Sequence, residues 1–191
     1  MYRVLICLFL VGCAASVQEQ PVNEVNENVI ERWPNKLPKI IHHKTAADAT
    51  EDSSFVRLEY FETGILKEVA TYNSGFLDSV QFLYYENGRL GAEYNYDFGI
   101  KDGSFRTWYE SGEIKSDYFF ENGMVTNGGM YFENGQIMGD LTFESGAIVS
   151  GIYYHENGNL RSRGNIRNGQ RSGEWKIYDK EGKLKEVLQY E

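Results

Sequence analysis

The chain of 191 residues is poor in the side chains that most often build catalytic and metal sites. It holds two cysteines, Cys7 and Cys13, three histidines and three prolines. It has no Gly-x-Ser-x-Gly segment, no phosphate-binding glycine loop and no spacing typical of metal ligands. We therefore expect no enzyme activity, no cofactor and no metal. The adjacent His42 and His43 lack a third ligand and are interpreted as solvated loop residues.

Basic side chains are also few. Lysine and arginine number 19 against 28 aspartates and glutamates, which gives a formal net charge of −9. A nucleic-acid partner needs a basic patch to neutralise its phosphates, so this class of partner is excluded. The acidic surplus alone selects no other partner, since acidic solvated surfaces are common.

Long hydrophobic runs are limited to the amino terminus. The apolar stretch at residues 4–10 is too short to span a membrane and is typical of a signal peptide. The following Leu10-Val11-Gly12-Cys13 resembles the bacterial lipobox. This resemblance implies removal of residues 1–12, acylation of Cys13 with fatty acids such as palmitate, and anchoring in the cell envelope, in the outer membrane where two membranes exist. The alternative is an ordinary signal peptide cleaved after Ala15.

Glycine, by contrast, is abundant and regularly placed. Six glycines recur at spacings of 24, 24, 23, 23 and 24 residues. Each has an aromatic residue four positions before it and Leu or Ile two positions after it. A fixed period of this length indicates one supersecondary unit stacked on copies of itself. The six glycines are Gly64, Gly88, Gly112, Gly135, Gly158 and Gly182.

The residues around each glycine alternate as in a β-strand, and helical spacing fits them poorly. Positions two, six and eight after the glycine are mostly apolar, so we expect them to share one face of a strand. A three-residue loop ending in a left-handed glycine places the residue four before the glycine opposite the residue two after it. The predicted cross-strand pairs are Tyr84 with Leu90, Trp108 with Ile114, and Tyr131 with Ile137.

A second glycine follows the first by 11 residues in five repeats and marks the return turn to the next copy. Six repeats of two strands each give about twelve strands. The predicted fold is all-β, an elongated single-layer antiparallel meander over residues 55–191. Residues 13–54 are interpreted as the lipidated cysteine and a flexible tether. Alternatively, Trp33, Ile40 and Ile41 dock on the first repeat.

Two segments of the repeats resemble a known family. Gly103-Ser-Phe-Arg-Thr-Trp108-Tyr109 and Gly173-Glu-Trp175-Lys-Ile-Tyr178 are similar to the Gly-x-Trp-x-x-Tyr opening of MORN repeats. The longer phrase, closing with Glu-Asn-Gly and Leu-Lys-Glu, resembles the MORN-variant repeats of the YwqK-type antitoxin family over residues 55–191. That resemblance implies a β-hairpin repeat fold and neutralisation of a toxin by binding. Immunity against an exported or incoming toxin is compatible with both this resemblance and an export signal.

Two columns of the repeat are candidate binding residues. Tyr85, Tyr109 and Phe132, three positions before their glycines, are expected to point away from the packed aromatic column and to offer a contact surface. Glutamates two positions before the glycines either line an acidic edge that attracts a cationic partner or are solvated turn residues, the simpler interpretation. These glutamates are Glu62, Glu86, Glu110, Glu133 and Glu156, of which Glu86, Glu110 and Glu133 are the binding candidates.

The sequence therefore predicts a bacterial envelope lipoprotein. Its exported part is a non-enzymatic β-repeat scaffold that binds another protein, while Cys13 attaches it to the membrane. The alternative is a protein that binds a glycan or another surface polymer, with its aromatic rings stacked on sugar faces.

Overall fold

The computed structural model describes residues 26–44 and 54–191, which form fourteen β-strands. This part of the chain contains no helix that is long and apolar enough to cross a membrane. The strands are β1 (Asn26–Arg32), β2 (Pro38–Lys44), β3 (Phe55–Tyr60), β4 (Leu66–Asn73), β5 (Phe76–Tyr84), β6 (Leu90–Asp97), β7 (Ile100–Trp108), β8 (Ile114–Glu121), β9 (Met124–Tyr131), β10 (Ile137–Glu144), β11 (Ala147–Tyr154), β12 (Leu160–Arg167), β13 (Gln170–Tyr178) and β14 (Leu184–Tyr190).

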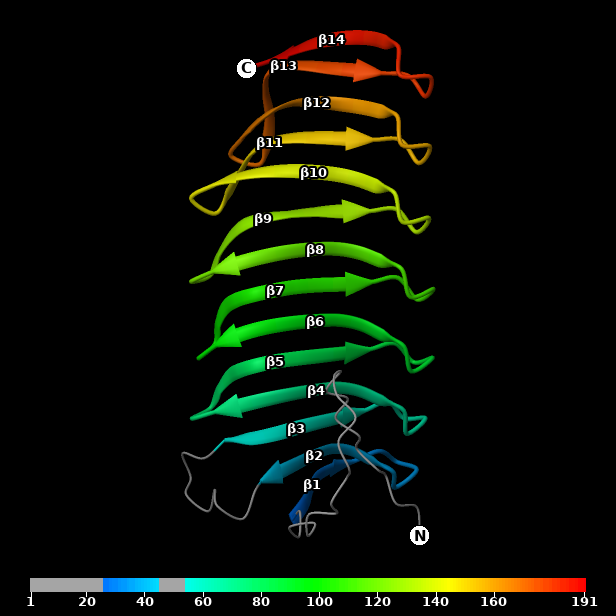
Figure 1. The fold of residues 1–191 in the computed structure, drawn as a ribbon. Helices are drawn as coiled ribbons and strands as arrows, with labels where there is room; N and C mark the ends of the chain where they lie inside the picture. The colour runs from blue at the N-terminus through cyan, green and yellow to red at the C-terminus, as the bar shows by residue number, and fades with distance from the viewer. Residues whose placement is uncertain (1–25, 45–53) are drawn as a thin grey trace, which may run out of the picture.

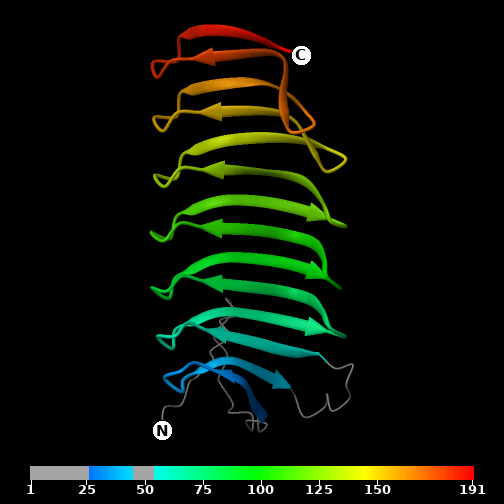
Figure 2. The ribbon, with the colours of Figure 1, turned by 180° about the vertical axis from the view of Figure 1, so that it is seen from behind.

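All fourteen strands belong to one antiparallel sheet, in which each strand pairs with its neighbours in the sequence. Figure 1 shows a single layer with short turns along one edge and the return connections along the other. The view from behind shows no second layer of described strands (Figure 2). The predicted single-layer meander is thus confirmed. We call the edge with the Glu-Asn-Gly turns the turn edge and the opposite one the return edge.

The turn around Gly88 illustrates the local geometry of the turn edge. The amide of Tyr85 donates to the carbonyl of Arg89 at 2.8 Å, and the amide of Gly88 donates to the carbonyl of Tyr85 at 2.9 Å. Gly88 has a φ of 81°, a left-handed conformation that glycine adopts without steric cost. The predicted register is confirmed by the pairs Tyr84–Leu90, Trp108–Ile114 and Tyr131–Ile137.

One part of the expected strand pattern is wrong. Tyr84 pairs with Leu90 while its neighbour Leu83 pairs with Ala92, so Gly91 is an extra residue in β6. Consecutive strand residues point to opposite faces, so this β-bulge puts Leu90 and Ala92 on opposite faces. The same shift occurs beside the other predicted turns. Position two after the glycine therefore does not share a face with positions six and eight.

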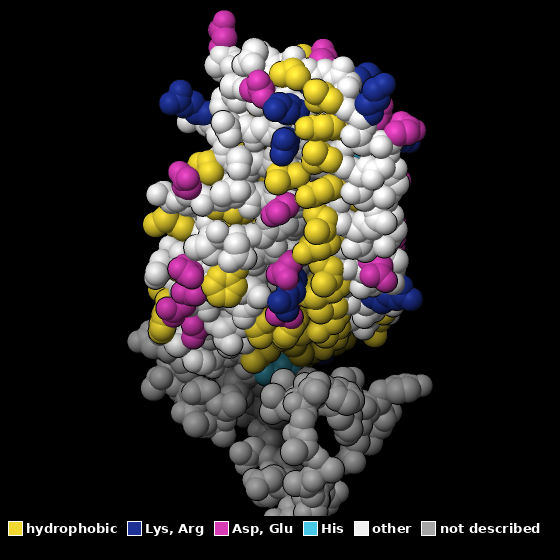
Figure 3. All heavy atoms as spheres, turned by 45° about the horizontal axis from the view of Figure 1, so that its top comes forward, with side chains coloured by type: hydrophobic (Ala, Val, Ile, Leu, Met, Phe, Trp, Pro, Cys, Tyr) yellow, Lys and Arg dark blue, Asp and Glu magenta, His cyan; other side chains and the backbone are white. Residues whose placement is uncertain are grey.

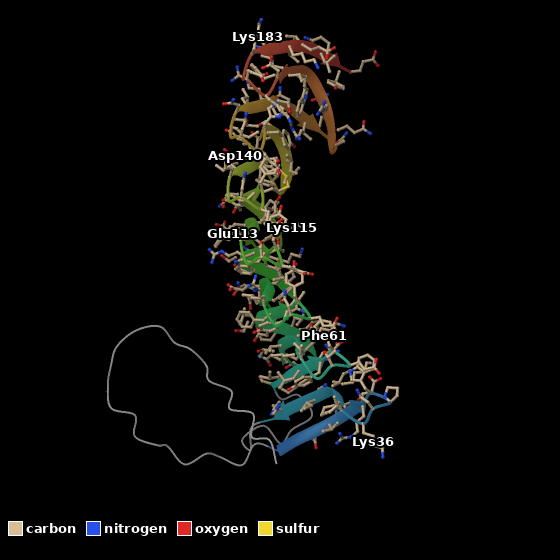
Figure 4. All side chains as sticks on the ribbon, turned by 90° about the vertical axis from the view of Figure 1, so that its right-hand side faces the viewer. Lys36, Phe61, Glu113, Lys115, Asp140 and Lys183 are labelled. Atoms are coloured by element: carbon tan, nitrogen blue, oxygen red, sulfur yellow. The ribbon has the colours of Figure 1, made fainter. Side chains whose placement is uncertain are left out.

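The sheet has two different faces. The aromatic face carries Phe105 and the rings that surround it. Phe105 pairs with Tyr118, whose neighbour Asp117 points to the opposite side, which we call the charged face. Figure 4 views the sheet from its turn edge, with Lys115 on one side and Asp140 on the other.

One row of directly paired residues crosses the whole charged face, and we call it the midline row. Its members are apolar in the first five strands and mostly charged from β6 onward. Figure 3 shows acidic and basic side chains beside a continuous apolar stripe. The turn-edge pair Tyr131–Ile137 lies on the charged face, because Tyr131 is two residues from Gly129 in β9. The midline row is Val29, Ile41, Leu58, Val69, Phe82, Glu93, Arg106, Asp117, Gly129, Asp140, Ile152, Arg163, Lys176 and Val187.

Residues 26–44 differ from the flexible tether expected within residues 13–54. They form the β1–β2 hairpin, whose turn repeats the geometry of the others. The amide of Trp33 donates to the carbonyl of Leu37 at 3.0 Å, and the amide of Lys36 donates to the carbonyl of Trp33 at 2.8 Å. Lys36 stands in the glycine position with a φ of 70°. The described chain therefore contains a seventh hairpin that the glycine period does not reveal.

This hairpin docks on the first predicted repeat, the alternative that the sequence left open. Ile41 pairs with Leu58 of β3, and the indole nitrogen of Trp33 donates to the carbonyl of Tyr60 at 3.1 Å. The interpretation of His42 and His43 as a solvated loop is wrong, because both lie half-buried in β2. Residues 1–12, predicted as a signal peptide, and Cys13 lie outside the described residues.

Candidate functional site

The turn edge is built from turns that hydrogen-bond to one another. In the Glu-Asn-Gly phrase, the side-chain oxygen of Asn134 accepts from the amide of Gln136 at 3.0 Å, which holds the turn in shape. The side-chain nitrogen of the same residue donates to the carbonyl of Glu156 in the next turn, also at 3.0 Å. Asn157 repeats the second bond to Lys180 at 2.7 Å. Asparagines thus fix the last three of these turns relative to one another, and Arg89 joins an earlier pair by donating to the carbonyls of Glu110 and Ser111.

The glutamates of these turns point into solvent. All five are exposed, and within the described residues none of their carboxylates forms an ion pair or a side-chain hydrogen bond. Successive glutamates stand two strands apart, about 10 Å along the edge. This acidic row, as we call it, contains Glu62, Glu86, Glu110, Glu133 and Glu156.

The aromatic candidates lie directly beside the acidic row, on the aromatic face. The hydroxyl of Tyr85 donates to the carbonyl of Trp108 at 2.6 Å, and that of Tyr109 donates to the carbonyl of Tyr131 at 2.8 Å. Both side chains are half-buried, and the hydrogen bonds from their hydroxyls join one repeat to the next. Phe132 occupies the same column without a hydroxyl. The sequence did not reveal this bonding role, although a column of Tyr, Trp and His is a pattern that could have suggested it.

The same column continues toward both ends of the sheet. Trp33 bonds to Tyr60 in the first hairpin, and a ring nitrogen of His155 lies 3.1 Å from the carbonyl of Tyr178. In the last turn the column holds Asp179. Its carboxylate accepts from the amide of Lys183 at 2.8 Å and so closes its own turn. The column residue of this turn thus bonds within its own turn.

The aromatic face is closely packed around Phe105. Its ring centroid lies 5.0 Å from that of Tyr94 in a stacked arrangement and 4.6 Å from that of Phe120. Burial raises the pKa of Tyr94 and of Tyr118 above the usual value for tyrosine. These rings contribute packing within the sheet, with little of their faces left for a ligand.

At its amino-terminal end the aromatic face carries an ion cluster instead. The Arg57 guanidinium contacts Glu59 at 2.6 Å and also contacts Glu68, while Lys67 lies 2.6 Å from Glu59. Burial alone would raise the pKa of Glu59, but the hydrogen bonds from Lys67 and Arg57 outweigh it and lower this pKa. Gln81 donates a further hydrogen bond to Glu68. The cluster is internally neutralised and presents no unpaired charge.

The charged face holds a groove that the sequence analysis did not anticipate. It has a volume of about 440 Å³ and is centred on Gly128 and Gly129 of β9, with Asp117 and Asp140 on the flanking strands. A Cβ atom at Gly129 would lie 2.9 Å from the carbonyl oxygen of Gly139, so the neighbouring backbone requires glycine there. The only sequence signal was that Gly128-Gly129 departs from the Gly-x-Trp pattern.

Within the described part of the chain, no group of three or more His, Cys, Asp or Glu side chains is arranged to hold a metal ion. The candidate surfaces are therefore the acidic row at the turn edge and the charged face.

Comparison with known families agrees with this hairpin geometry. The chain contains MORN repeat variants. The model of the MORN repeat variant matches residues 101–124, 151–168 and 171–191, each of which covers half or more of each of two successive strands and the whole turn between them. No curated protein matches the chain significantly. The MORN-variant repeats thus cover the carboxyl-terminal part, and the earlier hairpins continue the same sheet.

Proposed function

We propose that the protein is an envelope-anchored, non-enzymatic β-repeat scaffold that binds another protein through its turn edge. The observation that carries this proposal is the acidic row, five exposed carboxylates on an edge where hydrogen bonds join several neighbouring turns. A partner with basic side chains at a matching spacing can pair with several carboxylates at once. Because the turns are fixed before binding, little ordering cost opposes the association.

The binding surface combines two of the predicted columns. Glu86, Glu110 and Glu133 supply the charge, and the half-buried rings of Tyr85 and Tyr109 support the turns that carry them. Lys115 lies over the ring of Tyr109, with its nitrogen 5.5 Å from the ring centroid. The edge also carries a cation, since the guanidinium of Arg89 donates to the carbonyls of Glu110 and Ser111, and the rings form the inner support of the turns.

The location follows from the amino-terminal sequence. The resemblance of Leu10-Val11-Gly12-Cys13 to a lipobox supports cleavage before Cys13 and its acylation, which would tether the sheet to the envelope membrane. The resemblance to the YwqK-type antitoxin family supports an immunity role, in which the scaffold captures an exported or incoming toxin. Neutralisation would then consist of stoichiometric binding, without a chemical step.

The binding part is tested by capture from detergent-solubilised membranes. We compare the wild type with Glu86→Gln/Glu110→Gln/Glu133→Gln and with a control that removes three exposed carboxylates elsewhere, Asp97→Asn/Glu121→Gln/Glu144→Gln. The expected result is one stoichiometric protein partner, released by salt, retained by the control and lost from the first variant. Binding to a glycan array without a protein partner, or hydrolysis of an envelope polymer, contradicts the proposal.

The anchoring part is tested separately by feeding cells an alkyne analogue of palmitate. Wild-type protein is expected to incorporate the label and to sediment with membranes, whereas Cys13→Ser is expected to do neither. Label-free wild-type protein would refute the anchor and leave the binding proposal intact.

A further inference from the structure

We infer that the charged face is the interface of a symmetric dimer, in which a second copy of this chain packs on strands β8–β14. The starting observation is the arrangement around Ile152 in the midline row. Ile152 pairs with Asp140 on one side and with Arg163 on the other. Its side chain is 36% exposed, and within the described residues neither flanking charge has an ion-pair partner. A negative charge, an apolar residue and a positive charge in this order form a surface that is complementary to the same surface in a second copy turned by 180°.

A two-fold axis along β11 uses this complementarity directly. With this axis, a strand that follows β11 faces a strand of the second copy that precedes β11 by the same number of strands. Asp140 of β10 then faces Arg163 of β12 from the second copy, and the reciprocal pair forms by symmetry. The two Ile152 side chains meet on the axis. One contact pattern thus satisfies both unpaired charges twice.

The groove at Gly129 fits the next residue of the midline row. Gly129 lies two strands before β11, and Lys176 lies two strands after it. The same axis therefore places the ammonium group of the second copy's Lys176 in the groove beside Asp140, while Arg106 of the groove lining already pairs with Asp117 at 3.2 Å. In the isolated chain Lys176 has only an exposed contact with Glu174, at 3.2 Å. The groove, whose lining includes Gly129, provides the space that a lysine needs.

The apolar stripe of the charged face overlies itself in this arrangement. A rotation about the strand direction keeps each residue at the same distance from the turn edge, so the stripe of one copy covers that of the other. Ile137 would face Leu160, and Tyr131 would face Tyr178. Ile137 is 47% exposed and Val187 is 45% exposed, so this face has apolar area to bury.

The size of the surface suits a stable dimer. Seven strands at about 4.8 Å each span about 34 Å, and eight residues at about 3.3 Å each span about 26 Å. The product, about 900 Å² per copy, is close to the roughly 800 Å² that each partner buries in a standard interface. Sheets that pack face to face keep their strand directions within about 30° of each other, and an axis along β11 satisfies this because the two β11 strands are then parallel. The axis brings the turn edges of the two copies side by side, so the two acidic rows lie along the same side of the dimer.

The experiment is a charge swap followed by sedimentation velocity of the full-length chain in mild detergent at low and high salt. Wild-type protein is expected to form a dimer that salt weakens. Asp140→Arg and Arg163→Asp are each expected to weaken dimerisation by about tenfold or more, because like charges then face each other. The double variant restores opposite charges and is expected to regain the dimer. Asp97→Arg and Lys36→Asp, exposed residues outside strands β8–β14, are the matched controls and should dimerise normally.

Three results would overturn the inference. The first is wild-type protein that stays monomeric at 100-fold the concentration of an ordinary assay. The second is single variants that dimerise like the controls, and the third is a double variant that dimerises as weakly as the single variants. Circular dichroism of each variant separates loss of dimer from loss of fold. As an independent readout, Ile152→Cys in a Cys7→Ser/Cys13→Ser background should form a disulfide-linked dimer on mild oxidation, since the residue lies on the axis. Failure to do so contradicts the placement of the axis.

Discussion

The first and the last hairpins of the sheet distribute charge in opposite ways. In β2–β4 the midline row is apolar and includes Leu58, which is only 4% exposed, while the aromatic face holds the ion cluster around Arg57. In β11–β14 the midline row carries Arg163 and Lys176, while the aromatic face holds Trp175, which is 1% exposed. Arg57 and Trp175 both stand seven residues before the glycine of their turn. The two ends thus share one backbone geometry, but their charged side chains lie on opposite faces of the sheet.

This difference separates two kinds of information in the repeat. The turn hydrogen bonds, the left-handed position and the β-bulge are the same at both ends, so they determine the fold. The side chains on the two faces vary freely around that frame. A single-layer sheet leaves both faces partly open, so such variation creates surfaces for different partners. The exposed charges of the later strands are therefore informative about binding, whereas the repeated columns are informative about folding.

The largest effect is expected at the carboxyl-terminal end of this comparison. Trp175 lies over Gly164, and its indole nitrogen donates to the carbonyl of Asn165 at 2.8 Å. We expect Trp175→Ala to lower the free energy of unfolding by about 3–5 kcal/mol, because it leaves a cavity beside a glycine that cannot fill it. Urea denaturation measures the change. Val187→Ala, on an exposed site of the adjacent strand, is the control and should cost below about 1 kcal/mol.

The equivalent position at the amino-terminal end should be less sensitive. Arg57→Ala leaves Glu59 and Glu68 without their shared cation, and the expected loss is about 1–3 kcal/mol because the cluster is only partly shielded from solvent. Arg106→Ala is the matched control, since its 3.2 Å contact with Asp117 lies in the open on the charged face. Its cost should stay below about 1 kcal/mol. Equal losses in the two variants would remove the contrast between the ends.

The column that joins the repeats predicts a smaller effect at the centre of the sheet. Tyr109→Phe removes the hydrogen bond to Tyr131 and should cost about 1 kcal/mol in urea denaturation. Phe132→Tyr introduces a hydroxyl in the equivalent position and should gain about half as much. Loss of stability in both variants would show that the hydroxyl does not join the repeats.

The smallest expected effect is a pH dependence confined to the ion cluster. The pKa of Glu59 is lowered in the folded chain, so its stabilising contribution is present above the usual value of 4.5 and is lost as pH falls through the folded value. Stability measured by thermal unfolding should therefore fall below about pH 4.5 and fall less in Glu59→Gln. An unchanged pH profile in the variant would contradict this linkage.

Most of the fold could be predicted from the sequence, because the same hairpin turn around a glycine recurs six times. It yielded the hairpins, the turn edge and the register of pairs such as Tyr84–Leu90. It missed the first hairpin because Lys36 stands where the others have glycine, and because 28 residues separate it from Gly64. It also assigned position two after the glycine to the wrong face, since a β-bulge changes the alternation without changing the sequence period.

The candidate sites were less accessible from the sequence. The exposure of Glu86 and its equivalents could be expected from their place in a turn. The bonding role of Tyr85 could not, because it depends on a carbonyl of the next repeat, 23 residues away. The groove beside Asp140 was also missed. It requires the pairing of three strands around Gly129, which only the register establishes.

The most direct test of the contrast between the two ends is the labelling rate of single cysteines placed in the midline row. In a Cys7→Ser/Cys13→Ser background, Leu58→Cys and Ile152→Cys differ only in their position along one continuous row. A maleimide reagent, applied to dilute protein so that no dimer forms, should label Ile152→Cys at least about tenfold faster, because local opening must precede reaction at the buried site. Equal rates at the two positions would contradict the account.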